Sequence, residues 1–175
     1  LRKLAAEFGP AWVRVSGTWA TKTYYAFDGE EAPAGYQNVL SKEQWIGVLD
    51  FVKAIDGKLL VSFANCPGNH SKDEPWDSTQ AKMLMDYSIE YGVPVSAAEF
   101  TNEPNLIQLS GLPVGYTAAD HARDHDAFGA WLKENYPDCL FVGPCTVGDI
   151  DMFGAGMDGA GGGMAAGYEI VTTED

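Results

Sequence analysis

The sequence has few basic residues. Its 175 residues contain 11 Lys and Arg against 25 Asp and Glu, which gives a formal net charge of −14 at pH 7. The acidic residues outnumber the basic ones in most windows, so no basic patch is evident. Nucleic acids and densely sulfated polyanions need cationic surfaces, and this charge balance would repel both. We therefore expect no nucleic acid among the partners.

Cysteine and long apolar runs are scarce as well. Cys66, Cys139 and Cys145 are an odd number of cysteines without CxxC spacing. This pattern argues against a zinc site or a complete disulfide framework, and it favours small buried side chains. No run approaches the roughly 18 apolar residues of a membrane span. We expect neither a membrane span nor a bound metal.

Apolar residues make up 46% of the sequence and aromatic residues 12%, which is typical of a folded protein. Short apolar runs predict four strands, at 11–15, 58–64, 93–100 and 139–142. Helical spacing of apolar residues predicts helices between and before them, at about 1–8, 41–57, 77–91 and 118–135. We expect the polar stretch 16–41 to be a loop.

Strands that alternate with amphipathic helices indicate parallel βαβ units, either in a barrel or in an open doubly wound sheet. A complete (β/α)₈ barrel usually needs roughly 250 residues. The sequence is shorter and contains only four predicted strands. We therefore expect an α/β fold in which residues 1–175 form a partial (β/α)₈ TIM barrel of about four βα units, cut at both ends.

The segment 98–105 contains the residues best suited to chemistry. It lies at the carboxyl end of the third predicted strand, the face on which barrel enzymes place catalytic groups. Alternation along a strand would put Glu99, Thr101 and Glu103 on one side. Pro104 should keep Glu103 extended, so that its carboxyl group projects into the mouth of the site. On chemistry alone, a solvated loop carboxylate explains Glu103 as well as a catalytic acid does.

The triplet Asn102-Glu103-Pro104 resembles the acid/base motif of the clan of barrel glycosidases. Three further segments are similar, in the same order, to the heparanase-like glycoside hydrolase family 79: 10–18 (PAWVRVSGT), 62–68 (SFANCPG) and 142–144 (VGP). Ser16 stands where that family tends to have Gly, and Ala98 with Thr101 replaces a bulkier strand end that contains Gly. These departures leave the details of the substrate open.

The resemblance implies retaining hydrolysis of a β-linked uronic acid through a covalent glycosyl-enzyme, without a cofactor. Glu103 would be the general acid/base, and the nucleophile would be a second Glu about 5 Å away, on a later strand outside this sequence. Asn102, Thr18 and Asn65 would bind the sugar, and Arg14 would support the site. Glu99, deeper on the strand, is expected to be a buried hydrogen-bonding or ion-pair residue, and Arg14 would be a partner for it or for a catalytic carboxylate.

The acidic balance favours a β-glucuronidase over an enzyme that cleaves heparan sulfate. The family resemblance also implies a secreted, periplasmic or extracellular protein, in which further strands and any C-terminal β-sandwich domain lie outside this sequence. Capping of loops would explain Arg14, Thr18 and Asn65 nearly as well. Two alternatives stay open: another retaining glycosidase with an Asn-Glu-Pro motif, and a non-catalytic carbohydrate-binding protein on a degenerate barrel.

Weaker signals point elsewhere. Residues 154–159 match the nucleotide-binding pattern GxGxxG, but the nearby Asp149 and Asp151 would repel a pyrophosphate, so we expect a flexible loop there. His121 and His125 have metal-ligand spacing, yet they follow a core-facing stripe that favours hydrogen-bonded interface histidines. His70 has no evident partner. Several aromatic residues in the predicted loops could stack on sugars or plug the fold, namely Trp19, Tyr24, Tyr25 and Trp76.

Overall fold

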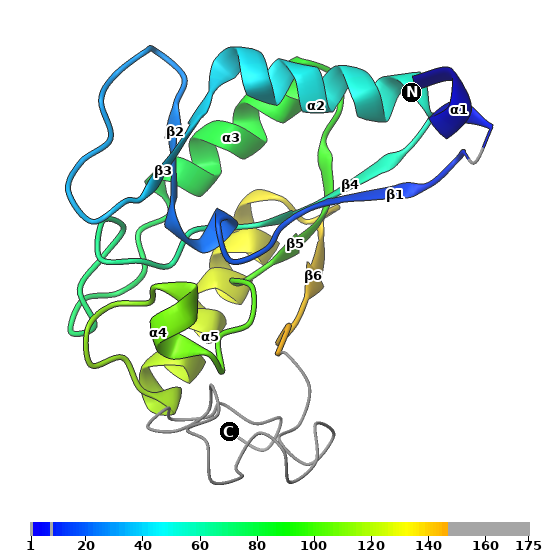
Figure 1. Cartoon of the computed structure of the whole chain (residues 1–175). Coiled ribbons are helices and arrows are strands. Elements are labelled where there is room, and N and C mark those ends of the chain that lie inside the picture. Colours follow the sequence, from blue (N-terminus) through cyan, green and yellow to red (C-terminus); the bar gives the residue numbers. More distant parts are fainter. Residues whose placement is uncertain (1, 8, 147–175) are drawn as a thin grey trace, which may run out of the picture.

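The computed structural model describes residues 2–7 and 9–146. Its centre is a four-stranded sheet with the order β1-β4-β5-β6, in which every pairing is parallel (Figure 1). The strands are β1 (Trp12–Val15), β4 (Lys58–Ser62), β5 (Val95–Glu99) and β6 (Leu140–Val142). The expected α/β class and all four expected strands are confirmed.

The helices are α1 (Arg2–Ala6), α2 (Lys42–Ala54), α3 (Thr79–Glu90), α4 (Ile107–Ser110) and α5 (Ala118–Asn135). Reciprocal hydrogen bonds start α2: the Gln44 backbone N–H donates to Ser41 Oγ at 3.3 Å, and the Ser41 N–H donates to Gln44 Oε1 at 2.9 Å. Thr117 and Asp120 start α5 in the same way. These boxes satisfy N–H groups that have no partner inside the helix, which explains why both helices begin where predicted. Within the described ranges, no helix is long and apolar enough to cross a membrane.

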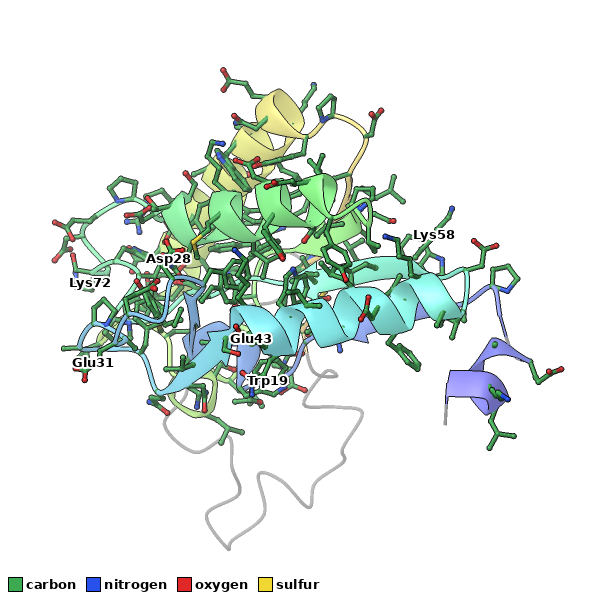
Figure 2. The ribbon with its side chains drawn as sticks, turned by 90° about the horizontal axis from the view of Figure 1, so that it is seen from above. Trp19, Asp28, Glu31, Glu43, Lys58 and Lys72 are labelled. Atoms are coloured by element: carbon green, nitrogen blue, oxygen red, sulfur yellow. The ribbon has the colours of Figure 1, made fainter. Side chains whose placement is uncertain are left out.

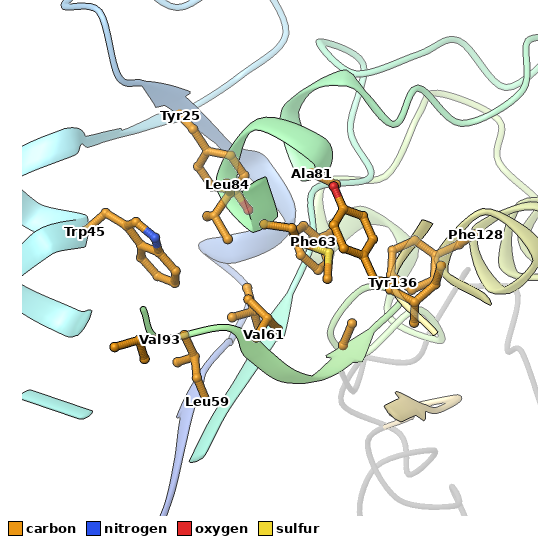
Figure 3. Packing of buried hydrophobic residues seen from close by; sticks show 14 of the residues in the cluster. Tyr25, Trp45, Leu59, Val61, Phe63, Ala81, Leu84, Val93, Phe128 and Tyr136 are labelled. Carbon is orange, nitrogen blue, oxygen red and sulfur yellow. The ribbon is translucent and has the colours of Figure 1, made fainter. Parts of the chain in front are cut away.

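Three helices cover one face of the sheet. Trp45 of α2, Leu84 of α3 and Phe128 of α5 are almost fully buried and belong to one apolar cluster with Val61 and Phe63, which lie in and just after β4 (Figure 3). Neighbouring residues of each strand point to opposite faces, so this packing leaves the alternate residues on the other face. In β1 those residues are Trp12 and Arg14, and both are exposed.

The strands run in one direction, which brings their carboxyl ends to one edge. Lys58 begins β4 and Lys72 lies in the loop that follows it, and the two residues are on opposite sides of the molecule (Figure 2). The edge at the carboxyl ends carries Ser62, Glu99 and the segment after β5. Glu99 pairs with Ser62 on one side and with Val142 on the other.

The loop expected over 16–41 is partly wrong. A short 3₁₀ helix (Ala20–Lys22) leads into β2 (Thr23–Ala26), which pairs in parallel with β3 (Asn38–Ser41) as a separate two-stranded sheet. The Tyr25 backbone N–H also donates to Gln80 Oε1 of α3 at 2.7 Å. Turn-forming residues between the two strands dominate the local sequence pattern. The pairing of β2 with β3 joins residues that are distant in the sequence, so the local pattern does not predict it.

Candidate functional site

The segment after β5 is anchored to the continuation of β6. Asn102 and Cys145 form an isolated parallel bridge, and the Glu103 backbone N–H donates to the Cys145 carbonyl at 3.0 Å. Asn102 is 5% exposed. The motif Asn102-Glu103-Pro104 is therefore held at the carboxyl edge of the sheet, as the sequence predicts.

The backbone of this segment is not extended. Thr101 has a φ of 59° and Glu103 a φ of 50°, so both lie in the left-handed region, and the expected extended Glu103 and one-sided alternation are wrong. The Glu103 carbonyl accepts hydrogen bonds from the Leu106 N–H at 3.0 Å and from Ser110 Oγ at 2.8 Å. These contacts turn the chain immediately after Asn102. Left-handed backbone is unfavourable for residues with a Cβ atom, and such strain tends to be kept at binding and active sites.

A buried carboxylate lies beneath the motif. Glu99 is 1% exposed, and Arg14 donates to both of its oxygens, from Nη2 to Oε1 at 2.7 Å and from Nε to Oε2 at 3.3 Å. The hydroxyl groups of Ser16 and Ser62 donate to Oε1, and Cys145 Sγ donates to Oε2 at 3.0 Å. The expected buried ion pair of Glu99 with Arg14 is confirmed. We call these five residues the Glu99 cluster.

The cluster also binds the motif itself. Asn102 Oδ1 accepts a hydrogen bond from Arg14 Nη2 at 3.0 Å, and it lies 3.3 Å from Ser16 Oγ, whose single hydrogen it shares with Glu99 Oε1. Arg14 thus connects the carboxylate of Glu99 to the carboxamide of Asn102, across strands that are far apart in the sequence.

The Glu103 side chain has a different environment. It is half-buried, and its carboxylate makes no hydrogen bond or ion pair with any described residue. A carboxyl group placed in this way, beside a fixed amide, can exchange a proton with a bound molecule.

The two remaining expected sugar-binding residues lie in different surroundings. Thr18 is half-buried in the turn after β1, where its carbonyl accepts from Thr21 Oγ1 at 2.7 Å. Asn65 is fully buried; its Nδ2 donates to the Tyr116 hydroxyl at 3.0 Å, and its Oδ1 lies 2.7 Å from His70 Nε2. Asn65 therefore serves an internal network, and the structure does not support its expected contact with a sugar.

The buried hydrogen-bond network around Asn65 was not predicted from the sequence. The Tyr116 hydroxyl donates to Asp124 Oδ2 at 2.8 Å, and Arg123 binds both Asp124 oxygens, at 2.8 Å and 2.9 Å. His70 Nε2 lies 3.7 Å from Asp124 Oδ2, so the expectation that His70 has no partner is wrong. Burial is the largest cause of the raised pKa of Tyr116. The members come from separate loops and from α5, and no local pattern links them.

The paired histidines face the core as predicted. His121 stacks on Phe100 with ring centroids 5.6 Å apart, and burial lowers its pKa to about 4. Both of its ring nitrogens, and Nε2 of His125, have no hydrogen-bond partner among the described residues, so the expected hydrogen bonds are absent. No group of three or more His, Cys, Asp or Glu side chains suited to a metal ion occurs in this part of the chain.

The four aromatic residues that were expected in loops differ in exposure, and two of them, Tyr24 and Tyr25, lie in β2 instead. Trp76 packs into the interior: it is buried, and its Nε1 donates to the Ala64 carbonyl at 2.9 Å. Tyr25 is buried as well, whereas Trp19 is 44% exposed in the turn after β1. Tyr24 is half-buried and meets Tyr36 edge to face.

A groove of about 630 Å³ lies at the opposite end of the sheet, lined by Trp12, Lys58 and Leu140 among others. These residues begin strands, so the groove is remote from Glu103. The GxGxxG pattern at 154–159 lies outside the described residues.

Comparison with models of known protein families and with curated proteins finds no match for this chain.

Proposed function

We propose that this chain is part of the catalytic domain of a retaining glycoside hydrolase that resembles family 79 and acts on a β-linked uronic acid. One observation carries the proposal. At the carboxyl edge of a parallel sheet, the Glu99 cluster holds the Asn102 carboxamide, while the adjacent Glu103 carboxylate has no protein partner among the described residues. Retaining glycoside hydrolysis uses two carboxyl groups, and Glu103 is placed to serve as the acid/base of that pair, with the Asn102 amide beside it for the sugar.

The strand order supports a barrel as the complete fold. The strands β1, β4, β5 and β6 are neighbours in the same order as they occur in the chain. A (β/α)₈ barrel adds strands in this sequential way, whereas a doubly wound sheet reverses its order at a switch point. We infer that the sheet is about half of a (β/α)₈ barrel, and that the other strands lie outside the described residues.

The chemistry that we propose is a double displacement. Glu103 gives its proton to the departing glycosidic oxygen while a second carboxylate attacks the anomeric carbon and forms a glycosyl-enzyme. Glu103 then takes a proton from water as that water attacks the same carbon and releases the second carboxylate. The Asn102 amide donates to the sugar 2-hydroxyl. The second carboxylate belongs to a residue outside those described, and neither a metal nor a cofactor takes part.

The first test compares Glu103→Gln with a matched control, Glu90→Gln, in the full-length polypeptide that contains this chain. Glu90 is exposed at the end of α3, away from the site. Loss of a general acid typically costs about 10²–10⁴-fold in rate. We expect a loss of this size for Glu103→Gln on alkyl β-glucuronides, a smaller loss on dinitrophenyl β-glucuronide, whose leaving group needs no proton, and no change for Glu90→Gln.

Full turnover of the alkyl substrate by Glu103→Gln would contradict the proposal. A panel of chromogenic glycosides identifies the sugar. Binding of sugars by the wild-type protein without any turnover would favour a carbohydrate-binding protein instead.

A further inference from the structure

We propose that Arg14 is a positioning residue that determines which way the Asn102 carboxamide points, and so makes this site dependent on the 2-hydroxyl of its sugar. This inference rests on the proposed function. It concerns a residue that does not touch the reacting atoms but acts through one that binds the substrate.

The hydrogen bonds define the orientation of the amide. Arg14 Nη2 lies 3.0 Å from Asn102 Oδ1, and Ser16 Oγ lies 3.3 Å from the same atom. A guanidinium group only donates hydrogen bonds, so an amide turned the other way would set its NH₂ group against another donor. The oxygen must therefore face Arg14, and the NH₂ group faces away from the Glu99 cluster.

Glu99 is what holds Arg14 in place. The Arg14 side chain is 48% exposed on the edge strand β1, and an exposed arginine would ordinarily sample many rotamers. Here its Nε and Nη2 each donate a hydrogen bond to one oxygen of Glu99, a carboxylate that is 1% exposed. The paired geometry fixes the guanidinium plane, which a lysine ammonium group could not reproduce.

The backbone of Asn102 leaves little other freedom. Its neighbours Thr101 and Glu103 are both left-handed, and the bridge to Cys145 ties the residue to the continuation of β6. With the backbone held, only rotation of the carboxamide could change which of its groups, the oxygen or the NH₂, faces the sugar. Arg14 and Ser16 hold the oxygen, so the site offers the NH₂ donor to the substrate.

The test is Arg14→Lys in the full-length polypeptide, assayed on an aryl β-glucuronide and on its 2-deoxy analogue. Loss of a hydrogen bond to a charged group predicts a fall in kcat/KM of roughly 10- to 100-fold on the normal substrate. On the 2-deoxy substrate, which has no 2-hydroxyl to bind, we expect a change below about threefold. Asn102→Ala should show the same pattern, and the double variant should lose no more than Asn102→Ala alone.

The matched control is Arg123→Lys, which alters an arginine bound to a buried carboxylate outside this site. It should affect both substrates equally. Equal losses on the two substrates for Arg14→Lys, or losses that multiply in the double variant, would overturn the inference. If Arg14→Lys does not fold, as judged by circular dichroism, Ser16→Ala replaces it, with a smaller loss that is again confined to the substrate with a 2-hydroxyl.

The inference and the proposed function can fail separately. A wild-type protein that is inactive on every glycoside contradicts the proposed function. In that case a neutron structure of Arg14→Lys, which distinguishes the amide oxygen from the NH₂ group, still tests the orientation without an assay. A rotated Asn102 carboxamide supports the role of Arg14, and an unchanged carboxamide overturns it.

Discussion

His121 of α5 is 3% exposed and stacks on Phe100, which directly follows β5. Burial is the main reason why its pKa is lowered from 6.5 to about 4; the nearby His125 adds to the lowering and Asp124 opposes it. The unfolded chain therefore binds a proton between these two values while the folded chain does not. Stability from this group is complete above pH 6.5 and is lost as the pH falls towards 4.

We expect acid to destabilise the wild-type protein through His121 by on the order of 3 kcal/mol over this interval. His121→Phe keeps a ring against Phe100 and removes the titration. Urea unfolding at a series of pH values should show a flatter decline for this variant than for the wild type. Parallel curves would show that His121 is not the group responsible.

The cysteine thiols should be unreactive in the folded protein. Burial raises the pKa of Cys139 to about 11 and that of Cys145 to about 12, and the Glu99 carboxylate adds to the shift at Cys145. Only the thiolate is nucleophilic, so little of it exists at neutral pH. Mass spectrometry after brief treatment with iodoacetamide should find these thiols unmodified in native protein and alkylated in urea. Rapid labelling of Cys145 in the native protein would show that its contact with Glu99 does not persist.

Some contacts of single residues could be predicted from the sequence, and others could not. The burial of Glu99 and its pairing with Arg14 could be expected, because both residues were placed on strands of one parallel sheet and carry opposite charge. The left-handed Glu103 could not. The rule for residues before proline considers only that pair of residues, whereas hydrogen bonds from Leu106 and Ser110 and to the continuation of β6 set this turn.

Two helix starts provide a matched comparison at the level of elements. Ser41 caps α2 through its hydroxyl group, whereas Ser78 precedes α3 without a side-chain capping bond, and Asp77 Oδ1 accepts from the Thr79 N–H at 2.7 Å instead. Ser41→Ala should lower the free energy of unfolding by about 1 kcal/mol. Ser78→Ala should cost less. Equal losses in chemical denaturation would contradict the assigned caps.

The elements differ in how far the sequence predicts them. The helix α5 follows from its apolar stripe, which is a local signal. The strands β2 and β3 pair across a long connection, and their few residues show no clear alternation of apolar and polar side chains. Prediction fails where the stabilising contact is distant in the sequence.

At the scale of the whole molecule, the face of the sheet opposite the helices is exposed at both edges. Trp12 of β1 is 51% exposed and Leu140 of β6 is 60% exposed. Apolar side chains beside unpaired strand edges favour association. The isolated 175-residue chain should therefore form oligomers in light scattering after size exclusion, and Trp12→Lys with Leu140→Lys should reduce them. A monomer at all concentrations would show that this face is already covered.

We propose that Glu103 donates and recovers the proton in a retaining glycosidase reaction. The most direct measurement is chemical rescue of Glu103→Ala in the full-length polypeptide, with an activated aryl β-glucuronide and sodium azide. Small anions can attack the glycosyl-enzyme without general-base assistance when the acid/base carboxylate is missing. We predict that azide restores turnover and that the product is the β-glucuronyl azide. A rate and a product that azide leaves unchanged would contradict the assignment of Glu103.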